Sequence, residues 1–528
     1  MKTKNIIYPV LIGIVSALTL TSCNDFLDTM PDNRTTLDSQ EKISDLLVTA
    51  YPSNQYAVIN ELISDNTDYY GATNPNGDRF GDQLFFWKDI TEASNEAPYN
   101  LWLSCYSAAA AANQALASLD ELKQDNEQAR TSRAEALLCR AYAHFVLVNE
   151  FSLNYNSKTS ATDPGIPVTT SVEAINVKKD RGNVAQVYEQ IERDIQAALP
   201  LMSDNYTVPK YHFNKRAAYA FATRFYLFYE KWDKAVEYAN LCLGTNPGAN
   251  LRDWKVLGGM AQKQEALANH YIDASLNCNL LLSTFRTAAG LYLGAYTYYK
   301  RYSHGRYLGD NEDMNAVNVW GTANYYEKPL SMAGSNFDVC LMMKIPYLFE
   351  YKDPVARTGY NRTVQALFTM DETLLNRAEA YIMLKQYDKA AADMNVWMHN
   401  ITNTSVQLTP KVIQKFYESV AYSYSDQAGI MSTVKKHLHP AFSIDEEGSV
   451  QETMLQCVLG FRRIETMHYG NRWWDVKRYG IEIVRREMGA DGKPSKLLDV
   501  MKKDDPRRAI QIPMQVREAG MAANPRNQ

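Results

Sequence analysis

Residues 461–480 read FRRIETMHYGNRWWDVKRYG, and this stretch says most about how the chain folds. Apolar residues recur three or four positions apart up to its middle, which predicts the buried face of a helix that Gly470 ends. Arg472, Asp475 and Arg478 then follow at intervals of three, so Asp475 can pair with either arginine on a second helix. The buried face consists of Val450, Met454, Cys457, Val458, Phe461 and Ile464. The segment therefore predicts two helices that are tied into the core.

The same segment holds two carboxylates that could be mistaken for a catalytic pair. Glycosidases need an acid and a base on either side of the scissile bond, and Glu465 with Asp475 offers two carboxyl groups. We expect the neighbouring arginines to hold both carboxylates ionised, which leaves no proton to donate. No GxSxG, HExxH or P-loop motif is present. The sequence predicts no enzyme, no catalytic residue, and a structural role for Glu465, Arg472 and Asp475.

The amino-terminal segment predicts export and lipid attachment. Lys2 and Lys4 precede an apolar run over 6–20, which is too short to span a bilayer permanently. The run ends in Leu-Thr-Ser-Cys at Cys23, and this ending resembles the lipobox of bacterial lipoproteins. Acyl chains on that cysteine would anchor the protein to a membrane, since each buried CH₂ contributes about 0.8 kcal/mol. The predicted organisation is a signal peptide over 1–22, removed by cleavage before the lipidated cysteine.

Repeated helical patterns indicate the architecture of the rest. Lys231–Ala235 and Gln386–Ala390 are near-copies in which an aromatic residue and an aspartate open a helix. The tetrapeptide Arg-Ala-Glu-Ala also occurs twice, at 133–136 and 377–380. Both motifs resemble the helix–turn–helix unit of tetratricopeptide repeats, although long insertions separate the copies. The prediction is a mostly α-helical fold with repeat helices over about 100–150, 183–245 and 370–400.

Two insertions differ in character from these helices. Residues 64–98 and about 285–360 are rich in Gly, Asn, Asp and aromatic residues and show little helical periodicity. We expect loops and short strands laid over a helical platform, which is where binding usually occurs. The predicted domains are a lipidated tether over 23–40 and one domain over 41–528.

Composition excludes several classes of protein. The chain is 46% apolar and carries a net charge of −5, so it is neither disordered nor a nucleic-acid-binding protein. The six cysteines after Cys23 lack metal spacing and suit apolar packing, although disulfides stay possible. Asp310–Asp313 could hold Ca²⁺, but a solvated acidic turn is the favoured reading, and no cofactor is expected. His437 and His439 precede Pro440, which suits a turn better than a metal site.

The chain resembles the SusD/RagB family of nutrient-binding outer-membrane lipoproteins from Bacteroidetes. The resemblance rests on the lipobox, the dispersed repeat helices, Ile512-Pro513, Asn524-Pro525 and the segment quoted above. One departure is Tyr469, where the family usually has a glutamate before the glycine. The matching residues of the signature are Arg462, Arg463, Glu465, Gly470, Arg472, Trp473, Asp475, Arg478 and Gly480.

This resemblance implies a surface-exposed lipoprotein of the outer membrane that partners a SusC-like TonB-dependent transporter. The expected ligand is an oligosaccharide, whose C–H faces stack on aromatic rings while polar side chains take its hydroxyls. A peptide ligand, as in the RagB branch, is the alternative. A tetratricopeptide-type scaffold for protein partners is the second alternative, and no nucleic acid is expected.

Two aromatic clusters in the insertions are the predicted ligand site, because the resemblance implies an aromatic arc built from an early loop and a mid-chain insertion. Trp87 and Trp320 are the preferred residues, since a large indole in a loop is costly to expose without use. The first cluster contains Asp68, Tyr69, Tyr70, Arg79 and Trp87, and the second contains Tyr292, Tyr296, Trp320, Tyr325 and Tyr326.

Overall fold

The structure is a computed structural model of the chain. Tyr296, the predicted signal peptide, Cys23 and most of the predicted tether lie outside the residues that it describes. The described residues are 37–172, 180–295, 301–322, 324–334 and 337–526.

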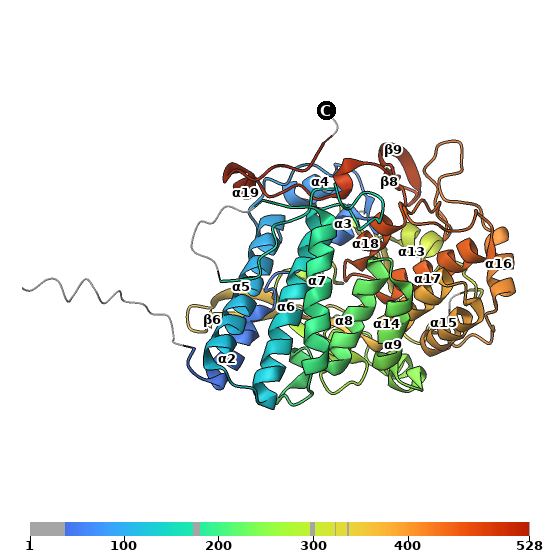
Figure 1. Ribbon diagram of the computed structural model, residues 1–528. Coiled ribbons are helices and arrows are strands. Elements are labelled where there is room, and N and C mark those ends of the chain that lie inside the picture. The colour runs from blue at the N-terminus through green and yellow to red at the C-terminus, as the bar shows by residue number, and fades with distance from the viewer. Residues whose placement is uncertain (1–36, 173–179, 296–300, 323, 335–336, 527–528) are drawn as a thin grey trace, which may run out of the picture.

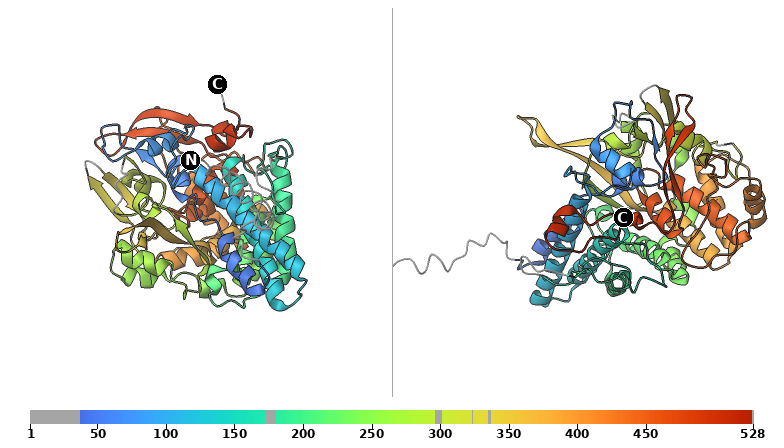
Figure 2. Two further views of the ribbon diagram at one scale, coloured as in Figure 1. Left: turned by 90° about the vertical axis from the view of Figure 1, so that its left-hand side faces the viewer. Right: turned by 90° about the horizontal axis from the view of Figure 1, so that it is seen from above.

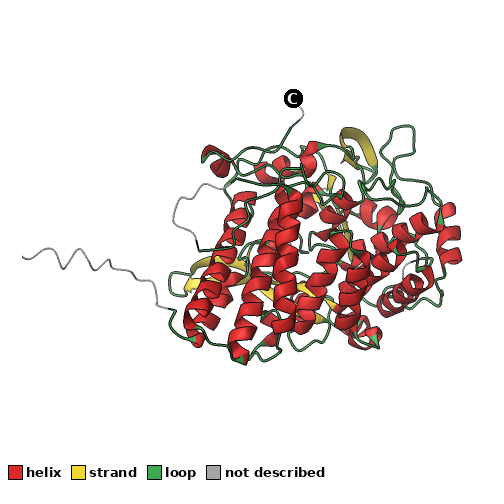
Figure 3. Ribbon diagram, in the orientation of Figure 1, coloured by secondary structure: helices red, strands yellow, loops and turns green. Residues whose placement is uncertain are grey.

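Long antiparallel helices form one side of the molecule and confirm the mostly α-helical prediction (Figures 1 and 3). Helices α5, α6 and α7 pack side by side, as do α8 and α9, and α14 packs against α9, α15 and α17. The longer helices are α2 (Gln40–Leu47), α5 (Pro98–Leu122), α6 (Glu127–Phe151), α7 (Val184–Ala198), α8 (Lys215–Phe228), α9 (Trp232–Leu243), α11 (Gln264–Tyr271), α14 (Met370–Met383), α15 (Tyr387–Ile401), α16 (Pro410–Glu418), α17 (Val450–Glu465) and α18 (Asn471–Arg478). The shorter ones are α3 (Ala57–Ile63), α4 (Arg79–Phe85), α10 (Trp254–Gly259), α12 (Ala289–Tyr292), α13 (Arg306–Glu312) and α19 (Met514–Glu518).

The two predicted copies of the repeat motif form equivalent helical hairpins. Glu230 and Lys385 each adopt a positive φ, of 59° and 57°, between the two helices of a hairpin. The residue after each donates its backbone N–H to a carbonyl of the preceding helix, from Lys231 to Tyr226 and from Gln386 to Tyr381. The alanines that follow are fully buried and allow close helix packing. The helix–turn–helix prediction is confirmed for α8–α9 and α14–α15.

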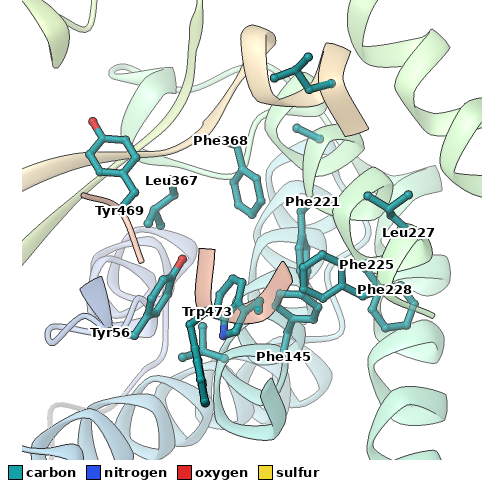
Figure 4. Close-up of a cluster of buried hydrophobic side chains, with 14 of the residues drawn as sticks. Tyr56, Phe145, Phe221, Phe225, Leu227, Phe228, Leu367, Phe368, Tyr469 and Trp473 are labelled. Carbon is teal, nitrogen blue, oxygen red and sulfur yellow. The ribbon is translucent and has the colours of Figure 1, made fainter. Parts of the chain in front are cut away.

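An aromatic core joins the helices to the sheet side (Figure 4). The Phe145 ring on α6 lies 5.7 Å from that of Phe221 on α8 and 5.6 Å from that of Trp474 on α18. Phe221 in turn lies 5.7 Å from Phe368 on a strand. The first two pairs meet edge to face and the third is tilted, and aromatic contacts of these kinds add to the stabilisation from apolar burial. The carboxy-terminal segment is therefore part of the central core.

Short strands carry the insertions, as the sequence predicts, although α4, α12 and α13 also lie within them. The sheets have the orders β3-β1-β8-β9, β2-β7-β6 and β4-β5. β1 pairs with β8 in parallel, Tyr69 opposite Glu487, which brings the early insertion against the carboxy-terminal strands. The strands are β1 (Asp68–Tyr69), β2 (Asn279–Arg286), β3 (Tyr302–Ser303), β4 (Leu330–Gly334), β5 (Phe337–Leu341), β6 (Leu348–Asp353), β7 (Thr358–Thr369), β8 (Ile483–Met488) and β9 (Pro494–Met501).

Two predictions about the carboxy-terminal segment are wrong in detail. The buried helix α17 already ends at Glu465, and Gly470 instead begins α18 with a φ of 81°. A Cβ at this glycine would lie 2.9 Å from the Ala57 backbone, so close packing on α3 explains the glycine. Asp475 pairs with Arg478, as the spacing predicts, whereas Arg472 pairs with Asp65 because α18 turns its first arginine toward the early insertion.

The structure also bears on two further predictions, one about the six cysteines after Cys23 and one about membrane-spanning segments. Six cysteines are free and buried, which confirms the packing interpretation: Cys105, Cys139, Cys242, Cys278, Cys340 and Cys457. Within the described part of the chain, no helix has the length and apolar character needed to cross a bilayer.

Candidate ligand-binding groove

A groove with a volume of about 1040 Å³ lies where the two insertions meet the β8–β9 hairpin. Its elements β8, β9 and α13 lie together in the upper right of Figure 1. Its size is at the upper end of the range typical of small-molecule sites, about 300–1,000 Å³. The lining residues are Tyr70, Gly71, Thr73, Asn74, Arg306, Tyr307, Asp310, Asn311, Asp338, Met431, Glu487, Met488, Gly489, Ala490, Asp491, Gly492 and Lys493.

The loop after β1 forms one wall because β1 is hydrogen-bonded to β8. Gly71 follows directly, with a φ of 83°, a conformation that favours glycine. A Cβ at this position would lie 3.0 Å from the Glu487 carboxylate, so the glycine also permits the close approach of the two walls. Gly71 thus allows the loop after β1 to pack closely against the β8–β9 hairpin.

The groove lining is polar and predominantly acidic. The lining contains four carboxylates and two cationic side chains, so its net charge is negative. Asp338 accepts a hydrogen bond from the backbone N–H of Arg306, and burial raises the pKa of this carboxyl. Burial also raises the pKa of Tyr70, whose hydroxyl lies close to Asp338. The carboxylates are Asp310, Asp338, Glu487 and Asp491, and the cations are Arg306 and Lys493. The carboxylates can accept hydrogen bonds from the hydroxyl groups of a ligand, and the cationic side chains can donate hydrogen bonds to them.

A buried ionic network fixes the floor of the groove. The Glu312 carboxylate at the end of α13 lies 2.7 Å from Lys436, 2.8 Å from Arg463 and 3.1 Å from Arg486. Burial alone would raise the pKa of Glu312, but the three cations outweigh it and hold the pKa well below its usual range. Arg486 also lies with its guanidinium 4.7 Å from the ring of Tyr307. The network therefore holds α13 and its tyrosine in place.

The two preferred ligand residues do not reach this groove. Trp87 is 8% exposed, and its indole N–H donates to the Ile63 carbonyl at 2.9 Å. Its ring is covered by the guanidinium groups of Arg485 and Arg507, at 4.3 and 5.1 Å. Trp320 is 4% exposed and lies against Phe461. The expectation that these indoles are exposed is wrong, because arginine side chains cover Trp87 and helix α17 packs against Trp320.

Most of the other predicted ligand residues also serve the fold. Asp68 is buried and pairs with Arg486 at 2.8 Å, and Tyr69 and Tyr325 are buried. Arg79 is exposed but pairs with Glu92, away from the groove. Tyr292 and Tyr326 are partly buried against the core. Tyr70 is the one predicted ligand residue that lines the groove within the described structure.

The acidic run Asp310–Asp313 is only half solvated, which corrects the turn predicted there. Its first two residues line the groove, whereas Glu312 and Asp313 are buried, the latter 3.2 Å from His304. No cluster of three or more metal-binding side chains occurs among the residues that the structure describes. His437 pairs with Glu447 at 2.6 Å.

Glu465 is buried, but arginines do not hold it ionised as predicted. Burial and the nearby charge of Asp371 raise its pKa to about 7. Trp397 donates its indole N–H to the Glu465 carboxylate at 2.9 Å. The adjacent Arg462 and Arg463 point elsewhere, to Asp475 and Glu312. Glu465 is absent from the groove lining, which agrees with a structural role.

Sequence reasoning missed the β8–β9 turn and most of α13. The turn Gly489–Lys493 reads as an ordinary hairpin turn, and its role depends on a contact with residues more than 400 positions earlier. Asp310 and Asn311 carried a usable signal, since they fall in an insertion and belong to an acidic run whose oxygens could bind Ca²⁺.

Comparison with known proteins agrees with this fold. Residues 25–227 match the model of a SusD-like family described as starch-binding and associating with the outer membrane. A search of curated proteins found no match.

Solved structures share the fold over nearly the whole chain. A SusD superfamily protein from Bacteroides thetaiotaomicron VPI-5482 is 18% identical with a TM-score of 0.59, over 93% of this chain and 100% of that one. A putative sugar binding protein from Bacteroides vulgatus ATCC 8482 is 17% identical with a TM-score of 0.61, over 93% and 99%. A laminarin binding SusD-like protein is 17% identical with a TM-score of 0.52, over 92% and 99%. The amino-terminal part of the chain thus matches a SusD-like family model, and nearly the whole chain has the fold of these structures.

Proposed function

We propose that this protein captures an uncharged oligosaccharide in the groove between α13, the loop after β1 and the β8–β9 turn. The observation that carries this proposal is the groove itself, which is large, polar and held by a buried ionic network. Sugar- and laminarin-binding proteins of the same fold support a glycan as the ligand class.

The chemistry of the lining favours a neutral sugar. Carboxylates such as Asp310 and Asp491 accept hydrogen bonds from hydroxyl groups, and bonds to a charged group contribute about 1.5–3 kcal/mol. A uronate or sulfate would meet a net negative lining, in which the carboxylates outnumber the cations Arg306 and Lys493. The groove therefore excludes acidic glycans by repulsion while binding neutral ones through their hydroxyls.

The sequence and the description of the matched family support a proposal for the wider role. We propose that Cys23 carries the lipid that anchors the protein to the outer membrane, facing outward. The captured oligosaccharide then passes to a partner TonB-dependent transporter. The lipobox and the description of the matched family as associating with the outer membrane support this assignment.

Anchoring is tested by Cys23→Ala, which removes the only thiol that the lipobox presents. We expect the variant to leave the membrane fraction, because no acyl chain can be attached. The measurement is fractionation of cells that lack the transporter, with high-salt washing. Retention of the variant in the outer membrane under these conditions would contradict lipid anchoring at this residue.

Ligand capture is tested by Asp310→Ala and Asp491→Ala. Both side chains line the groove, so each change is expected to lower the affinity for the cognate oligosaccharide by roughly ten- to a hundredfold. A glycan and peptide array identifies the ligand, and calorimetry measures the affinity of each variant.

Asp120→Ala is the matched control, because this exposed carboxylate on α5 pairs only with Arg133 on the helical side. It is expected to bind as the wild type does. Unchanged affinity in both groove variants, or an array that yields only peptides, would contradict the proposed capture of a glycan in the groove.

A further inference from the structure

The β6–β7 hairpin projects from the body of the molecule and carries a run of exposed aromatic rings. It is the yellow ribbon that extends to the upper left in the right-hand view of Figure 2. Tyr347, Phe349 and Tyr351 are 47%, 41% and 54% exposed. Tyr211 is the only other aromatic residue described in the structure that is comparably exposed. Three such rings on β6 or directly before it are a concentration typical of a binding surface.

The three rings share one face of the ribbon, because side chains two residues apart on a strand point the same way. Across the ribbon Phe349 faces Asn361 and Tyr351 faces Gly359. The Phe349 ring lies over Gly359, where a Cβ would meet it at 2.9 Å. The Tyr347 hydroxyl donates to the Asn361 side chain at 3.2 Å. This face, defined by the three rings, is here called the aromatic strip.

The ribbon that carries the strip is held firmly. β7 continues from the projecting part into the core, where Thr363–Thr369 are buried between β2 and the helices. On the face opposite the strip, the Tyr360 hydroxyl donates to Glu350 at 2.8 Å. The Arg286 guanidinium lies 4.9 Å from the same ring. Polar contacts thus occupy one face and leave the rings of the other face to solvent.

The size of the strip favours a narrow ligand over a globular partner. An aromatic side chain offers about 150–250 Å², so three half-exposed rings offer roughly 300 Å². A stable protein interface buries about 800 Å² on each partner, well above this area. The Phe349 and Tyr351 ring centroids lie 4.9 Å apart with their planes at 69°. The backbone from Tyr347 to Tyr351 spans roughly 13 Å along the strand direction. A chain of sugar rings fits a platform of this shape.

We propose that the aromatic strip of Tyr347, Phe349 and Tyr351 is a second carbohydrate-binding site that takes an extended stretch of the oligosaccharide class captured in the groove. This proposal rests on the proposed function for the ligand class, but on different residues for the site. Sugar C–H faces stack on the rings, and the neighbouring Asn361 amide supplies polar contact.

The test uses the full chain with the groove disabled by Asp310→Ala and Asp491→Ala, so that the remaining affinity for a long oligosaccharide reports the strip. Adding Tyr351→Ala or Phe349→Ala is expected to lower this remaining affinity roughly tenfold, as for other aromatic anchors. Tyr351→Phe retains the ring and is expected to retain binding. Lys352→Ala is the matched control, because its side chain points to the other face.

The possible outcomes distinguish binding at the aromatic strip from binding in the groove. Melting curves accompany every variant, and the retained binding of Tyr351→Phe shows that loss in Tyr351→Ala comes from the ring. Affinity that falls with the groove changes but not with Tyr351→Ala or Phe349→Ala overturns the strip alone. A wild type that binds no carbohydrate overturns both proposals. Strip variants that abolish self-association or capture of another protein, with glycan affinity unchanged, show a protein interface and overturn the proposal.

Discussion

Trp87→Ala is expected to lower the free energy of unfolding by about 3–5 kcal/mol and to leave ligand affinity unchanged in the protein that folds. The indole is buried and lies between the guanidinium groups of Arg485 and Arg507. Its removal leaves a cavity, strips both cations of an aromatic partner and frees the Ile63 carbonyl from its hydrogen bond. Trp87 has a φ of 49°, which is a strained backbone conformation for a residue other than glycine. Alanine at this position would keep the strain but lose the indole contacts that compensate for it.

The measurement is chemical denaturation together with calorimetry on the cognate ligand. For the denaturation measurement alone, Tyr351→Ala is the matched control, since its ring is 54% exposed and contributes little to packing. The control should unfold at nearly the wild-type denaturant concentration. A stable Trp87→Ala protein with lost affinity would reverse the assignment and return this tryptophan to the ligand site.

The different positions of Trp87 and Tyr351 show what the sequence could predict about binding. Both are aromatic residues in insertions without helical periodicity, and nothing in the local pattern distinguishes them. Burial is decided by long-range contacts, here with arginines on β8 and near the carboxy terminus. The insertion as a whole was predictable as a binding region, whereas the exposure of a given ring was not.

The helical platform was more accessible to prediction because its signals are local. Apolar spacing and the paired motifs Lys231–Ala235 and Gln386–Ala390 predict hairpins that the structure contains. The partners of buried ion pairs, in contrast, could not all be predicted from local spacing. Arg472 contacts Asp65 from the far end of the chain, although Asp475 stands three residues away at a suitable helical spacing. Helix orientation decides between such partners, and local spacing carries no information about it.

Asp475→Ala is expected to destabilise the protein by about 3–5 kcal/mol, because it leaves two buried cations without their shared partner. The Asp475 carboxylate lies 3.0 Å from Arg462 on α17 and 3.0 Å from Arg478 on α18. Glu379 on α14 contacts both arginines but cannot neutralise two charges alone. The contact between α17 and α18 should therefore loosen, while the groove, whose lining includes no residue of either helix, keeps its ligand affinity.

The dependence on pH distinguishes a lost ion pair from a lost packing contact. Burial opposes ionisation of Asp475, but Arg462 and Arg478 outweigh it and lower the pKa below the ordinary value of 3.8. A lowered folded-state pKa gives stability that is present above the unfolded value and is lost as the pH falls through the folded one. The difference in unfolding free energy between wild type and Asp475→Ala should thus be constant near neutrality and shrink below about pH 4.

Asp120→Ala serves again as the control, since its carboxylate is 69% exposed and its pair with Arg133 contributes at most about 1 kcal/mol. Denaturation curves at neutral and acid pH measure all three proteins. A loss in Asp475→Ala no larger than that of the control would show that Glu379 suffices for both arginines. A large loss that persists undiminished in acid would assign the effect to packing. Only a large loss that narrows in acid supports a buried carboxylate that holds α17 to α18 by its charge.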